Sequence, residues 1–387
     1  MIYLDHNAST PLRPEAVAAM RPCFEELYAN PSSLHRAGQQ ARAAVERARD
    51  QVASLLGAAS AEIVFVSGGT EGDHLALVGA AWARRDHGRR IAISAVEHHA
   101  VHGAADLLAE QGFAIEHLPV RADGWVEPET IDRLPDDTTV VSVMLANNET
   151  GVLQPVADVT RRAHARGILV HCDAVQAAGK ITVDVTNLDV DYLVVSAHKL
   201  GGPKGVGALV VRRSAPLSPL FRGSAHERGR RGGTENLPGI VGLGAAAECA
   251  ARELGEETPR LLALRQRLEA GIVALAPDAV FHGAAAPRLP NTVNVSFPGA
   301  RSDHLLMALD ARGVAVSAGA ACASGAVEPS PVLAAMGVPR PLAICALRLS
   351  LGRTTTPAEV EGALAALRES VPAARAATTP LGAEARG

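Results

Sequence analysis

Short apolar runs alternate along this chain with longer segments of helical period. The runs are rich in valine and isoleucine and apolar throughout, so each is predicted to be a strand buried on both faces. The expected strands are residues 63–67, 90–94, 140–145, 169–172, 192–195 and 207–211. The helical segments between them include 75–85, 99–110 and 156–165. This alternation predicts an α/β fold whose parallel sheet is covered by helices on both faces.

The pattern changes after about residue 250. A long charged helix is expected at 253–276, followed by strand-like segments at 292–297, 314–319 and 345–352 and by helices at 302–311 and 357–370. We predict a large domain at 13–252 and a smaller α/β domain at 253–371, which residues 1–12 join. Residues 372–387 lack apolar periodicity and are expected to form a disordered tail.

Composition argues against several classes of protein. A net charge of −4 provides no basic field for nucleic acid, and no apolar run approaches the length that spans a membrane. The first residues do not have the pattern of a signal peptide. The five cysteines, at 23, 172, 249, 322 and 345, are too scattered for a zinc pair or a disulfide framework. We therefore expect a cytoplasmic protein without a metal site or a membrane segment.

Polar residues that directly follow the expected strands are the candidates for chemistry, because ligands collect at the carboxyl ends of parallel strands. The segment SGGTE at 67–71 precedes a helix and suits an anion, although an ordinary turn has the same pattern. Asp173 follows a buried strand and needs a cation, such as the protonated nitrogen of pyridoxal, unless it caps a helix. Lys199 ends another strand, where desolvation lowers an amine pKa and favours Schiff-base chemistry. His98 follows a third strand and could stack on a flat ring.

Ten motifs occur in order between residues 2 and 370: YLDHNAST, NPSSLHRAG, SGGTEGDHLAL, EHHAV, NNETGVLQP, CDAVQAAGK, SAHKLGGPKGVGAL, HERGRRGGTEN, NTVNVSF and LRLSLGR. Together they resemble the cysteine desulfurases of the class V aminotransferase family. The resemblance implies the fold of fold-type I enzymes that use pyridoxal 5'-phosphate, with a large, mostly parallel domain and a smaller C-terminal α/β domain. It also implies a homodimer with active sites at the subunit interface.

The resemblance assigns the cofactor-binding residues. Lys199 matches the lysine that binds pyridoxal phosphate covalently, Asp173 the aspartate that pairs with its ring nitrogen, and Gln176 the residue that hydrogen-bonds its phenolic oxygen. His98 matches a histidine that stacks on the ring and moves protons. The residues that match the phosphate site are Gly69, Thr70, Ser196, His198 and, reaching over from the neighbouring subunit, Thr234.

The resemblance also assigns the substrate side. Asn148 and Arg348 match the pair that holds the substrate carboxylate, for which the planar fork of arginine is suited. Cys322 matches the sulfur acceptor; it lies among small residues that are expected to form a long, mobile loop. A small buried cysteine is the alternative for Cys322. The other four cysteines lie in apolar or helical settings and are expected to be inert, with Cys172 facing away from Asp173.

The implied reaction removes sulfur from L-cysteine. Lys199 moves the α-proton, the thiolate of Cys322 takes the sulfur as a persulfide, and alanine leaves. The persulfide then passes to an acceptor protein. Iron–sulfur cluster assembly, tRNA thiolation, cofactor biosynthesis and DNA phosphorothioation all draw on such enzymes, and no motif selects among them. The alternatives are a selenocysteine lyase, another class V reaction such as transamination, and a non-catalytic homologue that serves as an assembly partner.

Three positions depart from the family pattern without changing the reaction class: Gly72, His74 and Ala320, the last of which replaces a serine that commonly precedes the cysteine. A basic run contains arginines at 222, 228, 230 and 231. A solvated face beside the phosphate site is favoured for this run over a site for tRNA or an acidic partner.

Overall fold

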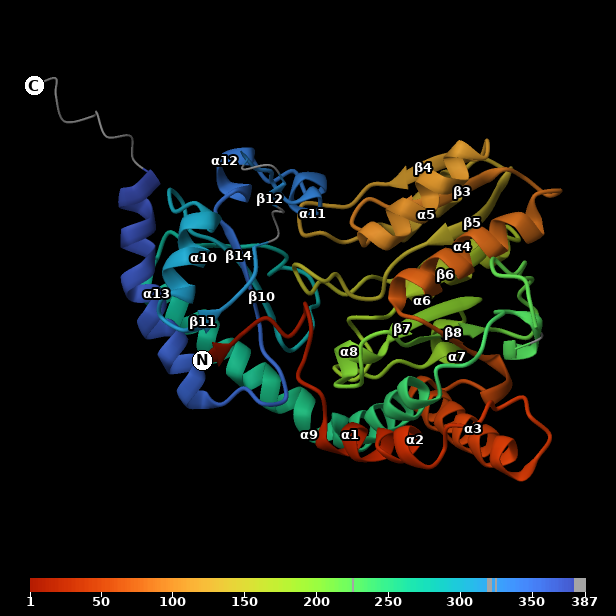
Figure 1. Cartoon of the computed structure of the whole chain (residues 1–387). Coiled ribbons are helices and arrows are strands. Elements are labelled where there is room, and N and C mark those ends of the chain that lie inside the picture. Colours follow the sequence, from red (N-terminus) through yellow and green to blue (C-terminus); the bar gives the residue numbers. More distant parts are fainter. Residues whose placement is uncertain (225, 319–321, 324–325, 379–387) are drawn as a thin grey trace, which may run out of the picture.

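The computed structural model describes residues 1–224, 226–318, 322–323 and 326–378, with the side chains of 322–323 and 326–327 outside the description. Figure 1 shows a larger half built on a central sheet and a smaller half that contains the C-terminal elements. The N-terminal strand lies with the smaller half (Figure 1), and the chain then crosses to the larger one. Among the described residues, no helix has the length and apolar character that crossing a bilayer requires.

The larger half contains a seven-stranded sheet with strand order β2-β8-β7-β6-β5-β3-β4. The strands are β2 (Ile63–Val66), β3 (Arg90–Ser94), β4 (Ala114–Leu118), β5 (Thr138–Ser142), β6 (Leu169–Asp173), β7 (Tyr192–Ser196) and β8 (Gly207–Val211). The pairs from β7 through β6, β5 and β3 to β4 are all parallel, whereas β8 is antiparallel to both of its neighbours. The prediction of an α/β fold with a mostly parallel sheet is confirmed.

Helices cover both faces of this sheet. One face is covered by α3 (Arg36–Leu56), α6 (Val156–Ala165) and the first part of α9 (Leu237–Leu275), and the other by α4 (Gly69–Arg84) and α5 (His99–Glu110). Successive side chains of a strand point to opposite faces, and β7 shows this directly. Leu193 and Val195 belong to the core under α3, whereas Tyr192 and Val194 belong to the core under α4. Because both faces of β7 are buried, Tyr192–Val195 form a continuous apolar run.

Two strands differ from the expectation. β4 is not predicted from the sequence, because it is an edge strand whose first four residues are exposed or half-buried and therefore form no continuous apolar run. β5 ends at Ser142, three residues before the predicted end. The backbone beyond it still reaches β6, since Leu145 donates to the carbonyl of Asp173.

The smaller half has its own apolar core. A three-stranded antiparallel sheet has the order β14-β10-β9, and β1 pairs in parallel with β11. These elements and their helices are β1 (Ile2–Tyr3), β9 (Val280–Phe281), β10 (Thr292–Ser296), α10 (Ser302–Asp310), β11 (Val314–Ala315), β14 (Ala346–Ser350) and α13 (Pro357–Thr378). Leu4 is fully buried in this core, so the N-terminal segment packs with C-terminal elements. The predicted domain boundaries stay a prediction.

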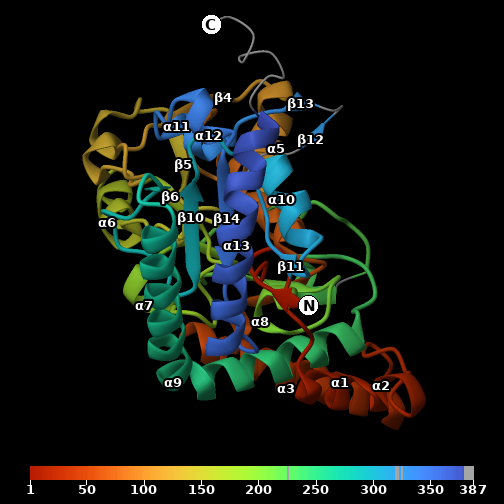
Figure 2. The same ribbon diagram turned by 90° about the vertical axis from the view of Figure 1, so that its left-hand side faces the viewer.

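Helix α9 connects the two halves without interruption (Figure 2). Ile240 and Leu243 pack in the core under α3, and Leu268 and Ile272 pack in the core of the smaller half. The predicted boundary at residue 252 therefore falls inside a continuous helix that contributes side chains to both cores.

The C-terminal tail begins later than predicted. α13 continues to Thr378, so residues 372–378 are helical rather than disordered. Val371 and Ala374 are buried in the core of the smaller half, and this packing supports the helix beyond Pro372. Residues 379–387 lie outside the described residues.

The remaining elements are short. They are α1 (Pro14–Met20), α2 (Pro22–Glu25), α7 (Val185–Leu188), α8 (Ala197–Leu200), α11 (Pro331–Ala335), α12 (Arg340–Ala343), the strands β12 (Cys322–Ala323) and β13 (Ala326–Val327), and the 3-10 turns η1 (Ser60–Glu62), η2 (Pro128–Arg133) and η3 (His226–Gly229).

A buried ion pair fastens α3 to the turn η3. The guanidinium of Arg49 donates to both carboxylate oxygens of Glu227, at 2.8 and 2.9 Å, and the two side chains are 1% and 2% exposed. Glu227 also accepts from the backbone N–H of Phe65 in β2. Glu227 and Arg228 have φ angles of 48° and 57°, a conformation that side chains other than glycine rarely adopt. The ion pair therefore stabilises a strained turn, and Glu227 of this turn lines the same pocket as Thr234.

We predict that Arg49→Met lowers the free energy of unfolding by about 3–5 kcal/mol, because it leaves the Glu227 carboxylate buried without its partner. Urea denaturation measures the change. Arg47→Met, at an exposed position of the same helix, is the control and should change stability by less than about 0.5 kcal/mol. Equal effects of the two variants would show that the buried pair is not what holds the turn.

Candidate active site

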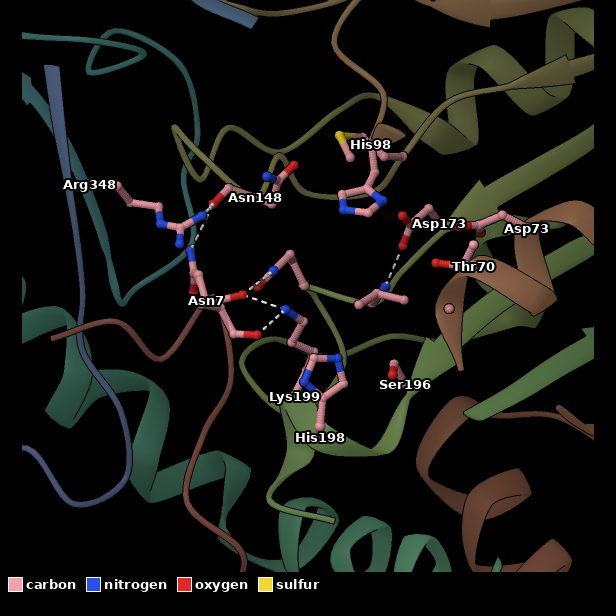
Figure 3. A pocket seen from close by; sticks show the side chains of 15 residues that line it. Asn7, Thr70, Asp73, His98, Asn148, Asp173, Ser196, His198, Lys199 and Arg348 are labelled. Carbon is pink, nitrogen blue, oxygen red and sulfur yellow. Dashed lines mark hydrogen bonds between the residues drawn. The ribbon is translucent and has the colours of Figure 1, made fainter. Parts of the chain in front are cut away.

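A cavity of about 400 Å³ lies where the two halves meet. All predicted cofactor- and substrate-binding residues except Thr234 line it, together with Asn7, Ala8, Asp73, Met144 and Val175. Figure 3 shows Thr70, Asp73 and Asp173 at one end and Arg348 and Asn148 at the opposite end, with Lys199 between them. The strand ends of the sheet thus supply most of the cavity, and β14 of the smaller half closes it.

The N-terminus of α4 lies at one end of the cavity, where its N–H groups suit an anion. The N-cap residue is Gly68, which has no side chain to bind the first N–H groups of the helix. Gly69 and Thr70 begin the helix beside Ser196. The first N–H groups of a helix have no partner within the helix and attract anions. Glu71 lies in the same turn; burial opposes its ionisation, but hydrogen bonds from Arg231 and Ser67 lower its pKa overall. Arg231 therefore balances the charge of a carboxylate in the first turn of α4.

Asp173 ends β6 and presents a carboxyl group to the cavity. One of its oxygens accepts from the backbone N–H of Val175 at 2.8 Å. Burial raises its pKa to about 6, opposed by the Val175 N–H and by the charge of Lys199. The preceding residue, Cys172, is buried in the core under α3, so it faces away from the cavity as predicted. A cationic N–H is the partner that this buried carboxylate requires.

Lys199 presents an amine in the middle of the cavity. Its Nζ donates to the carbonyl oxygens of Asn7 at 2.5 Å and Ala8 at 2.7 Å. Burial lowers its pKa to about 8; Arg348 lowers it further, and the charges of Asp173 and Asp5 oppose the shift. The predicted lowering by desolvation is therefore present, and an appreciable fraction of the amine is neutral near pH 8.

His98 caps the N-terminus of α5 and faces the cavity (Figure 3). Its Nδ1 accepts from the backbone N–H of Ala100 at 3.1 Å, so a neutral ring carries its proton on Nε2. Burial lowers the pKa of His98 to about 4, and the charge of Lys199 adds to this effect. At neutral pH the ring is therefore an uncharged, flat surface.

Arg348 occupies the opposite end of the cavity. Its guanidinium donates to the carbonyl of Asn148 at 3.0 Å and to a carboxylate oxygen of Asp5 at 2.8 Å. The side chain is buried, and its Nε has no hydrogen-bond partner among the described residues. Arg348 is thus held in place by two groups while several of its N–H donors stay available to a carboxylate in the cavity.

Asn7 belongs to the site, although the sequence predicts no role for it. Its carbonyl accepts from Lys199 and from Gln176, and its side chain donates to Thr292 at 2.9 Å. It is 1% exposed. The only sequence signal was its place in the first motif, because its partners lie far away along the chain.

A buried acid cluster behind Asp173 is also absent from the sequence prediction. Asp73 lies 3.3 Å from Nε2 of His171, whose Nδ1 is 2.9 Å from the hydroxyl of Ser142. Glu97 accepts from Ser94 and from the backbone of Met144. Burial, followed by the charges of Asp173 and Glu97, raises the pKa of Asp73 well above its ordinary value. Because Asp73 keeps its proton to a higher pH, Asp173 is the first of these two carboxyl groups to ionise.

Thr234 is not among the residues that line the cavity. Thr234 lines a separate pocket of about 100 Å³ with Ser67 and Gly205, so its predicted contact with a neighbouring subunit stays a prediction. The backbone of Cys322 pairs with Val327. The side chain of Cys322 and the whole of Ala320 lie outside the described residues. The predicted mobile loop around Cys322 therefore stays a prediction.

The segment that carries Cys322 is tied down on both sides beside the cavity. Before it, Ser317 exchanges two backbone hydrogen bonds with Arg348, at 2.7 and 3.1 Å. After it, the hydroxyl of Ser330 donates to the carboxylate of Glu149 at 2.5 Å. Glu149 directly follows Asn148. Both predicted substrate-binding residues therefore lie next to an attachment point of this segment.

The other cysteines and the basic run have structural surroundings. Cys23, Cys172, Cys249 and Cys345 are all buried. Burial raises the pKa of three of them, Cys23, Cys172 and Cys345, which disfavours a reactive thiolate. In the basic run, Arg228 and Arg230 donate to the carbonyl of Ala61, and Arg231 binds Glu71. These three arginines are therefore engaged within the chain, and the interpretation of the run as a solvated face stays a prediction.

The chain is similar over nearly its whole length to known proteins. Residues 2–362 match the family described as Aminotransferase class-V. The protein named Cysteine desulfurase IscS from Methanosarcina thermophila is 44% identical over 371 residues, which cover 96% of this chain and 92% of that protein. A solved structure described as a NIFS-like protein has a TM-score of 0.89 at 39% identity, covering 95% of this chain and 98% of that one. Another, described as SspA in complex with cysteine, has a TM-score of 0.79 at 32% identity, covering 91% and 99%.

The acid cluster makes a pH-dependent prediction about stability. Burial raises the pKa of Glu97 from 4.5 to about 8, so the folded protein keeps a proton that the unfolded chain loses between these pH values. Wild-type stability should therefore fall as the pH rises through this range. Glutamine does not titrate, so Glu97→Gln should gain about 3 kcal/mol relative to wild type between pH 4.5 and pH 7.

Urea unfolding at the two pH values measures this gain. Glu116→Gln, on the edge strand β4, is the control and should follow the wild type. If the free energies of unfolding of Glu97→Gln and wild type differ by the same amount at both pH values, Glu97 does not hold an additional proton in the folded protein.

Proposed function

Because this chain belongs to the class V aminotransferase family, we propose that it is a cysteine desulfurase that uses pyridoxal 5'-phosphate. It removes sulfur from L-cysteine and leaves L-alanine and a persulfide on Cys322. The predicted fold-type I architecture agrees with its NifS-like neighbours. The observation that carries the proposal is a single cavity that gathers an anion site, a buried carboxylate and an amine of lowered pKa.

The cavity fits the cofactor at each of its polar groups. The α4 N-terminus with Gly69, Thr70, Ser196 and His198 would hold the phosphate, and Asp173 would hold the protonated ring nitrogen. His98 would stack on the ring, and Gln176 would bind its phenolic oxygen. When bound, pyridoxal phosphate supplies an electron sink that weakens the bonds at the α-carbon of an amino acid.

Lys199 has two duties in this proposal. As a neutral amine it binds the cofactor covalently, and once displaced it accepts and returns the α-proton of the substrate. The carbonyls of Asn7 and Ala8 hold its Nζ in the middle of the cavity. Its pKa of about 8 suits both duties, because a base and nucleophile works best when its pKa lies close to the working pH.

Arg348 and Asn148 orient the substrate. The fixed guanidinium of Arg348 would bind the cysteine carboxylate at the end of the cavity opposite the anion site (Figure 3). This placement directs the rest of the amino acid toward Lys199. The contact of Arg348 with Asp5 keeps the guanidinium from rotating away before the substrate arrives.

Cys322 receives the sulfur. Support comes from the attachment of Ser317 beside Arg348, because five residues of chain reach at most about 18 Å from that point. The thiolate attacks the substrate sulfur, and a sulfur–sulfur bond forms as the carbon–sulfur bond breaks. The buried cysteines are unsuited to this step because their thiols are enclosed.

The partners follow from the same proposal. Thr234 would reach the phosphate of a neighbouring subunit in a homodimer, which makes dimerisation part of the site. The persulfide would pass to a sulfur-acceptor protein such as an iron–sulfur scaffold or a thiolation enzyme. A reducing cytoplasm would keep Cys322 as a thiol between turnovers.

Replacing Cys322 tests the reaction. We expect Cys322→Ala to release no sulfide or alanine from L-cysteine, because no thiol is left to take the sulfur, while pyridoxal phosphate stays bound. Sulfide and alanine are measured with a reductant present. Cys23→Ala, at a buried cysteine far from the chemistry, should retain wild-type rates. Retained sulfide and alanine formation in Cys322→Ala would contradict the role of Cys322. Transfer of an amino group to glyoxylate or pyruvate that Cys322→Ala leaves unchanged would favour a transaminase.

Replacing Arg348 tests the substrate site. Arg348→Lys keeps the charge but loses the planar fork, so we expect KM for L-cysteine to rise roughly ten- to a hundredfold. Steady-state kinetics measure KM and kcat separately. Arg340→Lys, at a surface arginine paired with Glu328, is the matched control and should leave KM unchanged. An unchanged KM in Arg348→Lys would place the carboxylate elsewhere.

A further inference from the structure

A second buried lysine lies beside the cavity. Lys180, four residues after Gln176, is 8% exposed. Its Nζ donates to the amide oxygen of Gln176 at 2.7 Å and to the side-chain oxygen of Asn7 at 3.1 Å. In both contacts Nζ donates to an oxygen atom, so Lys180 binds the oxygen end of the Gln176 amide.

The opposite end of the Gln176 amide is fixed as well. Its Nε2 donates to the backbone carbonyl of Asn7 at 2.9 Å. A carbonyl is only an acceptor, so it selects the nitrogen end of the amide. Reversing the amide would place oxygen against oxygen at Asn7 and nitrogen against nitrogen at Lys180. Because Gln176 is 4% exposed, water does not relieve these contacts.

This orientation leaves one donor of Gln176 for a ligand. Nε2 carries two hydrogens, and the carbonyl of Asn7 takes one of them. Gln176 lines the cavity, and no second acceptor for Nε2 occurs in the part of the chain that the structure describes. The remaining N–H therefore suits an acceptor atom of a bound molecule.

We propose that Lys180 is a positioning residue that holds the Gln176 amide with its N–H toward the phenolic oxygen of the cofactor. This inference rests on the proposed function, which identifies the ligand. Without Lys180 only the carbonyl of Asn7 opposes reversal of the amide, so the reversed amide becomes more populated and its oxygen then meets the phenolic oxygen. Two acceptors in contact repel, so the cofactor loses affinity and its oxygen holds a proton more tightly.

The effect of removing Lys180 should be confined to Gln176. Asn7 keeps other partners, since its side-chain oxygen also accepts from Asn291 and its nitrogen also donates to Thr292. Lys199 therefore keeps its contact with the carbonyl of Asn7. Burial, followed by the charges of Lys199 and Arg348, lowers the pKa of Lys180 well below its ordinary value.

The first experiment adds pyridoxal phosphate to Lys180→Met apoprotein. We expect the dissociation constant to rise roughly ten- to a hundredfold, and the pH midpoint of the absorption band of the bound cofactor to shift upward. Thr258→Val removes a hydrogen bond to the backbone carbonyl of Lys180 and spares its amine, so it is the matched control. Wild-type values in Lys180→Met, with the control also normal, would overturn the proposal.

A double-mutant cycle separates positioning from a direct effect of the lysine. Gln176→Ala should show the same upward shift, and the double variant Lys180→Met with Gln176→Ala should shift no further than Gln176→Ala alone. Additive shifts would mean that Lys180 acts without Gln176 and would overturn the proposal.

Gln176→Glu tests the orientation in a protein that keeps Lys180. A carboxylate has no N–H to donate, so this variant should bind the cofactor more weakly than Gln176→Ala. Binding equal to wild type would overturn the assigned orientation. If wild-type protein neither binds pyridoxal phosphate nor releases sulfide from L-cysteine, the proposed function is wrong. If wild-type protein does both and Lys180→Met binds the cofactor as wild type does, only the inference about Lys180 is wrong.

Discussion

The hydrogen bonds of Asn7 hold the two halves of the molecule around one cavity. Its side chain binds Thr292 of the smaller half, and its carbonyl accepts from Lys199 and Gln176 of the larger half. Because an unpaired buried polar group costs about 1–3 kcal/mol, these partners fix the N-terminal segment where it crosses between the cores. The position of Lys199 relative to Arg348 depends on this crossing.

Burial then divides the titratable groups of the site into two kinds. His98 and His171 are uncharged near neutral pH, with pKa values of about 4 and 3, because desolvation disfavours their cationic forms. Glu97 keeps its proton for the same reason, with a pKa of about 8. Asp173 and Lys199 line the cavity, and their pKa values of about 6 and 8 lie on either side of neutral pH. These two groups can change charge during a reaction without leaving the accessible range of pH.

The parts of the site that the sequence predicts are those with a local signal. Asp173 ends an apolar strand and Lys199 follows the next one, so the rule for strand ends indicates both. Asn7, Asp73 and Lys180 carry no such signal, because their partners lie elsewhere in the chain. β4 also lacks a local signal, because it is a half-exposed edge strand and its residues form no continuous apolar run.

The sequence by itself determined the α/β class, the alternation of strands and helices, and the types of reactive side chain, because apolar runs and ordered motifs are properties of short stretches. Only the tertiary structure decided which of these groups are charged, which amide end faces the cavity, and that Asp5, Asn148 and Arg348 meet. The physical reason is that desolvation and hydrogen bonding between distant segments arise when the chain packs, and no local pattern of residues encodes them.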